Sequence, residues 1–274
     1  MKKIIMLTTS ILSLYIHVNA QKYGSLTDSR DGKTYKTVII GNQEWMAEDL
    51  ATTKFTNGDV ITNLEDKYGW SKALTNKTPA WCKSPTGKSM VYNGLAVIDK
   101  RQLCPIGWRI PDVNDWDVIV SKFGGYENAS VKLKSNTGWA KYFEYEGGSN
   151  IVNCTNCYSW SDEYKRKVAC HKCKDKRYLI LDKPKIWKSG NGNNLSGFSA
   201  KPGGGKRLYD GQWSYLDKED NAVYYWTLYS DRPGTYTYLI IRNWMKKIDW
   251  MDIGYSYFGG LGDNEAVSVR CIKD

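Results

Sequence analysis

The chain has 274 residues, with 39 Lys and Arg against 29 Asp and Glu, so its formal net charge is +10. A composition that is 41% hydrophobic and 25% charged is typical of a globular protein and excludes a disordered or fibrous chain. The aromatic residues are mainly the polar-tipped ones, 12 Trp and 20 Tyr against 5 Phe, which favours a loop-rich fold with some rings on binding surfaces.

The N-terminus has the pattern of a secretory signal peptide. Two lysines precede a mostly apolar stretch over residues 4–16, and a small-residue cleavage pattern follows at residues 18–20 (VNA). A membrane-spanning helix needs about 18 or more apolar residues, which is more than this stretch supplies. We therefore expect residues 1–20 to be removed. The mature chain, residues 21–274, would be exported to the periplasm, the outer cell surface or the medium, peripheral to the membrane and in an oxidising compartment.

The first half of the mature chain is expected to contain short strands and irregular loops. Residues 36–40 (KTVII) predict a strand that runs into a turn, and residues 44–47 predict extended structure or a short helical turn. Residues 52–94 mix Thr, Asn, Gly and Lys with isolated aromatic residues, which indicates long irregular loops rather than regular helices.

One main helix is predicted at residues 112–123. Asp112 or Asn114 can cap its first amides, and acidic side chains near its start suit the positive end of the helix dipole. Trp116 and the apolar residues that follow it at helical spacing give one buried face, and Gly124-Gly125 ends the helix.

From residue 197 onward, short segments of alternating apolar and polar residues are separated by turn residues, as in antiparallel strands. The expected strands are residues 198–200, 213–215, 224–226, 236–242 and 267–272. Because the sequence has no internal repeat and no Pro- or Ser-rich linker, we expect a single α+β domain over residues 21–274, interrupted by an insert at residues 140–190.

The insert carries two C-x2-C pairs separated by twelve residues, formed by Cys154, Cys157, Cys170 and Cys173. Four thiolates at about 2.3 Å complete a tetrahedral structural zinc site, which leaves no open position for catalysis. We expect such a zinc-knuckle-like insert. Two disulfides are an open alternative in an oxidising compartment, and thiol–disulfide exchange is a third, although no thioredoxin-like βαβ pattern surrounds either pair.

The insert is also basic. Residues 161–190 hold ten Lys or Arg against four acidic residues, a net charge of +6 that would offset the charge of a tetrathiolate site. Such a surface suits acidic glycans, lipopolysaccharide phosphates or an acidic protein partner, and a solvated loop is the alternative interpretation. Export argues against nucleic acid as the ligand.

An aromatic cluster near the C-terminus is a second candidate binding surface. Rings of this kind stack on sugars, and the acidic and amide side chains around them suit calcium or sugar hydroxyls, whereas core packing is the alternative for most of the rings. The candidate ligand-binding rings are Trp244, Trp250, Tyr255 and Tyr257, and the candidate oxygen ligands are Asp249, Asp252, Asp263, Asn264 and Glu265.

Four ordered motifs resemble a known family. They are residues 31–50 (DGKTYKTVIIGNQEWMAEDL), 103–111 (LCPIGWRIP), 196–204 (SGFSAKPGG) and 268–271 (SVRC). Together they resemble the Fibrobacter succinogenes major paralogous domain, a family of exported proteins of Bacteroidetes and Fibrobacteres. The WRIP sequence before the helix and the terminal Arg-Cys are also similar to the C-type lectin-like fold shared with formylglycine-generating enzymes. The resemblance thus implies a C-type lectin-like domain but no particular reaction.

Within such a domain, the resemblance implies a disulfide between Cys104 and Cys271, which would tie the last strand to the start of the helix. Closing so long a loop would contribute about 4–5 kcal/mol on chain-entropy grounds. Two buried free thiols are the alternative. Cys82 is then left over, and we expect it to be a buried thiol without a role.

The function expected from these patterns is noncatalytic. An exported cell-surface recognition or adhesion module that binds glycan or a surface protein fits the signal peptide, the aromatic residues and the basic insert. The alternative is a structural accessory subunit of an outer-membrane or cell-surface assembly that docks through the Cys-rich insert. An enzyme is disfavoured, because residues 174–270 hold no closely spaced cysteine pair of the kind used in formylglycine formation, and His171 lies between cysteines of the expected zinc site.

Overall fold

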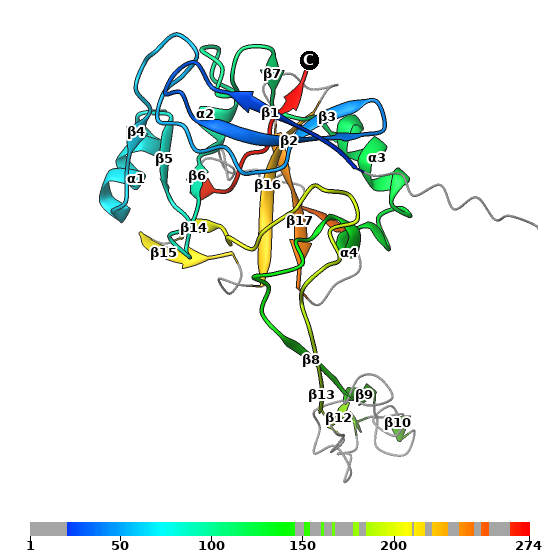
Figure 1. Ribbon diagram of the computed structural model, residues 1–274. Coiled ribbons are helices and arrows are strands. Elements are labelled where there is room, and N and C mark those ends of the chain that lie inside the picture. The colour runs from blue at the N-terminus through cyan, green and yellow to red at the C-terminus, as the bar shows by residue number, and fades with distance from the viewer. Residues whose placement is uncertain are drawn as a thin grey trace, which may run out of the picture.

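The computed structural model of the chain describes residues 21–145, 151–153, 160–161, 166–167, 178–180, 185–209, 211–216, 221–229, 236–243, 248–251 and 264–274. In these residues strands predominate over helices and almost all strand pairs are antiparallel, which confirms the expected α+β class (Figure 1). None of the helices in the described part is long and apolar enough to cross a membrane.

A five-stranded sheet brings the two ends of the described chain together. Its strands, in order across the sheet, are β1 (Lys22–Thr27), β2 (Thr34–Ile40), β3 (Gln43–Met46), β20 (Ile272–Lys273) and β7 (Trp108–Arg109). All neighbours in this sheet are antiparallel, so the last strand of the chain is held between β3 and β7. The strand predicted at residues 36–40 lies within β2, and residues 44–46 are the extended strand β3 rather than a helical turn.

A second sheet forms the centre of the core. It consists of β16 (Ala222–Leu228), β17 (Tyr236–Arg242) and β18 (Ile248–Met251). The side chains of β16 alternate between the two faces: Tyr224 and Trp226 pack on one face, and Val223 and Tyr225 pack on the other. Both faces are buried, which explains why β16 and β17 are apolar along nearly their whole length.

The predicted main helix is α3 (Val113–Lys122), which covers one face of this central sheet. Its N-terminus has a capping box, because the Asp112 side chain accepts a hydrogen bond from the N–H of Asp115, and the Asp115 carboxylate accepts one from the N–H of Asp112. Gly124 and Gly125 follow the helix with φ values of +99° and +75°, a backbone conformation that favours glycine and ends the helix.

The prediction of long irregular loops over residues 52–94 is wrong. The stretch forms a nine-residue helix and a small sheet, which are α1 (Lys67–Thr75), β4 (Thr62–Asn63), β5 (Ala80–Lys83) and β6 (Met90–Tyr92). The Asp66 side chain caps α1 by accepting a hydrogen bond from the N–H of Gly69. Only Trp70 and Ala73 of α1 are buried, so the sequence lacks the apolar periodicity that marks most surface helices. With α1 nearly as long as α3, the fold does not have a single main helix.

The remaining elements include a third sheet and two short helices. They are β15 (Gln212–Tyr215), β14 (Lys206–Tyr209) and β19 (Glu265–Ala266), with α2 (Gly94–Val97) and α4 (Ala129–Leu133). The strands predicted at 213–215, 224–226 and 236–242 are confirmed in β15, β16 and β17. Residues 267–272 form two isolated bridges and the short β20 instead of one continuous strand.

Residues 198–200 do not form the predicted strand. Ser199 has a φ of +56°, and only Ala200 forms an isolated bridge, with Lys134. The physical reason is that the carbonyl groups of Phe198 and Ser199 accept hydrogen bonds from the Arg270 side chain, so they do not pair with a neighbouring strand.

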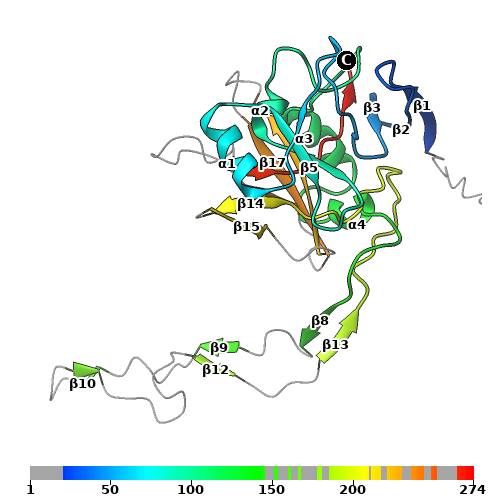
Figure 2. The ribbon, with the colours of Figure 1, turned by 90° about the vertical axis from the view of Figure 1, so that its left-hand side faces the viewer.

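The insert leaves the body as an arm of successive antiparallel strand pairs. These are β8 (Tyr142–Tyr145) with β13 (Lys185–Lys188), β9 (Ile151–Asn153) with β12 (Tyr178–Ile180), and β10 (Trp160–Ser161) with β11 (Arg166–Lys167). Figure 2 shows β8 and β13 at the root of the arm, β9 and β12 farther from the body, and β10 beyond them.

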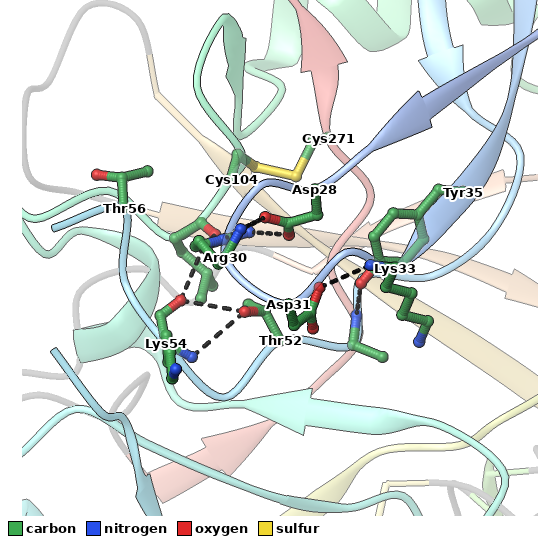
Figure 3. A network of polar contacts seen from close by, with 12 residues as sticks. Asp28, Arg30, Asp31, Lys33, Tyr35, Thr52, Lys54, Thr56, Cys104 and Cys271 are labelled. Carbon is green, nitrogen blue, oxygen red and sulfur yellow. Dashed lines mark hydrogen bonds and ion pairs between the residues drawn. A yellow bond between two sulfur atoms is a disulfide. The ribbon is translucent and has the colours of Figure 1, made fainter. Parts of the chain in front are cut away.

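The disulfide implied by the resemblance is present. It joins Cys104 to Cys271 across 167 residues of sequence, and therefore links the last strand to the segment before α3. Cys82 is a buried free cysteine, as expected. The disulfide lies next to a polar network that connects three segments of the chain (Figure 3).

Arg30 is the centre of that network (Figure 3). Its Nε and Nη2 donate to the buried carboxylate of Asp28 at 2.8 and 2.6 Å, and its Nη1 donates to the carbonyl groups of Lys54 and Leu103 at 2.8 and 2.7 Å. Burial alone would raise the pKa of Asp28, but the hydrogen bonds and charge of Arg30 outweigh burial and lower the pKa below its ordinary value. The network fixes the turn between β1 and β2, which contains Lys33 and leads directly to Tyr35 of β2.

Candidate functional site

Most of the predicted site residues lie outside the described part of the chain. They are Cys154, Cys157, Cys170, Cys173, Trp244, Tyr255 and Tyr257, together with the calcium candidates Asp252 and Asp263. Trp250 and Asp249 lie in β18, where they pair with Leu239 and Ile240 of β17. Among the described residues, no three His, Cys, Asp or Glu side chains are grouped so that they could hold a metal ion.

Two of the calcium candidates have partners within the protein. Asn264 donates a hydrogen bond to the carbonyl group of Leu208, and Glu265, which is 2% exposed, accepts one from Nε of Arg207 at 2.7 Å. Burial raises the pKa of Glu265, and the guanidinium of Arg207 opposes that shift. In the structure these contacts join β14 to β19.

The described surface contains a groove made of two adjoining hollows, with volumes of about 270 and about 480 Å³, which share Ala47, Glu48 and Lys201. We call it the lysine groove. The charged and aromatic residues that line it are Tyr23, Lys33, Tyr35, Lys36, Glu48, Asp49, Lys88, Lys201 and Arg270.

Arg270 and Asp49 form the floor of the groove. Arg270 is fully buried, and its Nε donates to Oδ1 of Asp49 at 2.8 Å. Its other nitrogens donate to the carbonyl groups of Phe198 and Ser199, and its guanidinium lies 4.3 Å from the centre of the Phe198 ring. Tyr225 donates a further hydrogen bond to Asp49. Because the charge of Arg270 is already paired, the floor holds the groove together rather than offering a free cation.

Tyr35 forms one wall. Its hydroxyl oxygen accepts a hydrogen bond from the N–H of Ala51 at 3.1 Å, and the ammonium group of Lys33 lies 5.0 Å from the centre of its ring. Burial raises the pKa of Tyr35 to about 12, so the ring stays neutral at physiological pH. Tyr35 is therefore a fixed, neutral part of the wall, and because it is only 1% exposed it offers no free ring face to a ligand.

The rim carries the free charge of the groove. Lys33, Lys36, Lys88 and Lys201 are all exposed, whereas Glu48 is half-buried and accepts a hydrogen bond from the backbone N–H of Lys36 at 2.7 Å. Tyr23, at the outer end, is 57% exposed. Four lysines thus face one carboxylate that is not part of the Arg270 pair, and the groove is locally cationic.

Three of the four sequence motifs meet at this groove. Residues 31–50 supply Tyr35 and Glu48, residues 196–204 supply Lys201, and residues 268–271 supply Arg270. Sequence reasoning placed the functional positive charge in the insert and missed the groove, because its lysines come from segments that are far apart along the chain. The signal that could have identified the groove was that the motifs contain charged residues to which the sequence assigns neither a turn nor a place in the core.

The groove can bind a ligand by ion pairing, hydrogen bonding and ring contact. Its described lining offers lysine ammonium groups for anionic groups, Glu48 for hydroxyls and Tyr23 for an apolar ring face. The lining supplies no histidine or cysteine for proton transfer or nucleophilic attack in the described residues.

Comparison with known proteins gives one match. A family model described as the Fibrobacter succinogenes major domain matches residues 38–273, which include the groove residues from Glu48 to Arg270. No curated protein and no solved structure matches the chain.

Proposed function

The chain belongs to the Fibrobacter succinogenes major domain family, and we propose that it is an exported, noncatalytic recognition module that binds an acidic glycan at the cell surface. The observation that carries this proposal is the lysine groove, whose two hollows are lined by four exposed lysines. Glu48 is the one carboxylate of this lining that is not paired with Arg270. Export rests on the signal-peptide pattern of residues 1–20.

An acidic polysaccharide fits the groove better than a compact ligand. The two hollows adjoin at Ala47, Glu48 and Lys201, so together they suit an extended chain of sugar units more than a single buried group. An exposed ion pair contributes only about 0–1 kcal/mol, so useful affinity requires several lysines to act together on a polymer with repeated carboxylates or sulfates. The exposed ring of Tyr23 adds an apolar surface for a sugar face.

Charge-reversal variants with a matched control test the proposal. We expect K88E/K201E to bind polygalacturonate or heparin at least about tenfold more weakly than the unaltered protein, and we expect binding to weaken with salt. K100E/K122E makes the same change in net charge at exposed lysines that do not line the groove, and we expect near-normal binding. Equal losses in the two variants, or no binding of either polymer by the unaltered protein, would contradict the proposal.

We further propose that the body has a C-type lectin-like fold. Two features support this. The disulfide ties the terminal strand to the segment before α3, and that strand pairs with β3 on one side and with β7, which directly precedes α3, on the other. A crystal structure whose body superposes on a lectin-like domain is the direct test.

The second candidate function is that of an accessory subunit that docks through its arm. The strand-paired arm, which extends away from the body in Figure 2, favours it. Lys185 pairs with Tyr145, so replacing residues 146–184 with a two-residue Asn-Gly turn closes the ribbon at its root without disturbing the body. We expect this arm-less variant to keep glycan binding in the groove. Loss of a co-purifying membrane complex on arm removal would favour the assembly role instead.

For the four cysteines of the insert we keep the proposal of a structural zinc ion. Its support is the strand pairing of the arm, in which Asn153 pairs with Tyr178 and Trp160 pairs with Lys167. Along the chain, the first C-x2-C pair lies between Asn153 and Trp160, and the second lies between Lys167 and Tyr178. We expect one zinc per chain by metal analysis and four thiols that react only after chelation. A metal-free protein with no free thiols in this segment would indicate two disulfides.

A further inference from the structure

A separate hollow lies at the root of the arm, where the arm joins the body. Its volume is about 380 Å³, and it is lined by residues of both parts: Tyr142, Phe143, Glu144 and Trp187 from the arm, and Asn221 and Asn243 from the body, with Lys141 between them. None of these residues lines the lysine groove. The hollow is therefore an independent site.

Two aromatic rings of this hollow are presented to solvent. Trp187 and Phe143 are cross-strand partners in β13 and β8, with ring centres 5.6 Å apart in an edge-to-face arrangement. Trp187 is 64% exposed and Phe143 is 40% exposed. A core-packing role does not account for such exposure, because most other Trp side chains among the described residues are buried or half-buried. Their pairing across two bonded strands holds the rings in place before any ligand binds.

The body side of the hollow is polar and incompletely hydrogen-bonded. Asn243 is only 3% exposed, and its Nδ2 donates to the carbonyl group of Ala140 and to Oδ1 of Asn221. The Oδ1 atom of Asn243 is buried and has no hydrogen-bond partner. An unpaired buried acceptor is costly, and Asn243 lines the hollow, so a small shift of its side chain on ligand binding would bring Oδ1 to a donor in the hollow.

From these observations we infer that the hollow at the root of the arm is a carbohydrate subsite for a pyranose ring. The C–H face of the sugar stacks on Trp187, and a sugar hydroxyl donates to Oδ1 of Asn243. The carboxylate of Glu144 and the amide of Asn221 bind further hydroxyls. Oε2 of Glu144 also forms an ion pair with Nζ of Lys188 at 2.7 Å.

The combination of groups favours a sugar over an apolar partner. A pyranose is a small molecule with an apolar C–H face and hydroxyl groups around its edge. It can therefore contact the exposed indole and donate hydrogen bonds to the asparagines at the same time. An apolar side chain of a protein partner would cover Trp187 but leave Oδ1 of Asn243 unpaired. A neutral sugar suffices, because Glu144 is already paired with Lys188 and Lys141, the other charged residue of the lining, is exposed to solvent.

The test uses the full chain with labelled tryptophan. The probes are neutral hexasaccharides (cello-, xylo-, manno- and laminarihexaose), added to protein in which the 12 Trp residues carry ¹⁵N. The indole N–H signal of Trp187 is assigned by its disappearance in W187F. We expect at least one hexasaccharide to shift this signal, W187F to keep partial binding, and W187A to bind at least about tenfold more weakly. Y68A removes another exposed aromatic side chain, on α1, and should bind normally.

Three results would overturn the inference. The first is that no hexasaccharide shifts the Trp187 signal, and the second is that W187A and the unaltered protein bind with equal affinity. The third is that the Trp187 signal broadens with protein concentration alone, which would show that the root of the arm pairs with a second copy of the chain. The outcome is distinguishable from failure of the lysine groove, because K88E/K201E leaves the hollow unchanged and should keep the Trp187 response.

Discussion

Arg270 and Asp49 lie 221 positions apart in the sequence, yet Nε of Arg270 is 2.8 Å from Oδ1 of Asp49. The Asp49 side chain is largely buried and the Arg270 side chain is almost completely buried. The pair connects the segment after β3 to the segment before the terminal strand, and it also supports the loop at Phe198 through that loop's carbonyl groups. A single ion pair therefore positions three of the segments that form the lysine groove.

Removal of this cation should destabilise the fold strongly. We expect R270M to lower the free energy of unfolding by about 3–5 kcal/mol, because Asp49 is left as a buried charge without its partner. R101M is the matched control: Arg101 pairs with Asp99 and Asp59 at the surface, and its loss should cost about 1 kcal/mol or less. Urea unfolding curves measure both. Similar losses in the two variants would show that burial of the Arg270 pair has no special effect.

The disulfide should stabilise the fold through the length of the loop that it closes. The bridge between Cys104 and Cys271 spans 167 residues, and its removal should lower the free energy of unfolding by up to about 5 kcal/mol. The C104A single variant and the C104A/C271A double variant should lose nearly the same amount, because either change breaks the same bond. If the double variant instead loses clearly more than C104A alone, the side chains contribute by packing and not only by the cross-link.

Local signals made part of the fold predictable. The helix at residues 112–123 could be predicted because Asp112, Asp115 and Gly124 act within one or two turns of the chain, and the structure uses them as a capping box and a terminator. The apolar run of β17 (Tyr236–Arg242) identified a strand with its observed bounds. In both cases the information lies in neighbouring residues.

The parts that could not be predicted depend on distant contacts. Helix α1 buries only Trp70 and Ala73, and the ring of Trp70 packs against Trp213, which is far along the chain. The bend at Ser199 reflects hydrogen bonds from Arg270 that no local pattern reveals. The candidate sites share this property, because the lysine groove and the hollow at the root of the arm each draw side chains from separate segments.

Lys134 should make stability depend on pH. Its ammonium group is buried and donates to the carbonyl groups of Arg242 and Asn243, and burial lowers its pKa to about 8 from an ordinary value of about 10.5. The unfolded chain therefore binds more protons than the folded chain between these two values, and stability should rise with pH across that window. We expect the unaltered protein to gain stability relative to K134M from about pH 8 upward. A difference that stays flat or falls between pH 8 and pH 10 would contradict this prediction.

Cys82 should be invisible to thiol reagents in the folded protein. The side chain is fully buried in the cluster that includes Trp70 and Val91, and burial raises its pKa to about 12. Both the access of the reagent and the thiolate that reacts with it are therefore lacking at neutral pH. We expect native C82S and the native unaltered chain to show the same number of reactive thiols. After denaturation, the unaltered chain should show one reactive thiol more than C82S. A native count that falls by one in C82S would place Cys82 at the surface, and any thiols that remain reactive in that variant would then report on the cysteines of the arm alone.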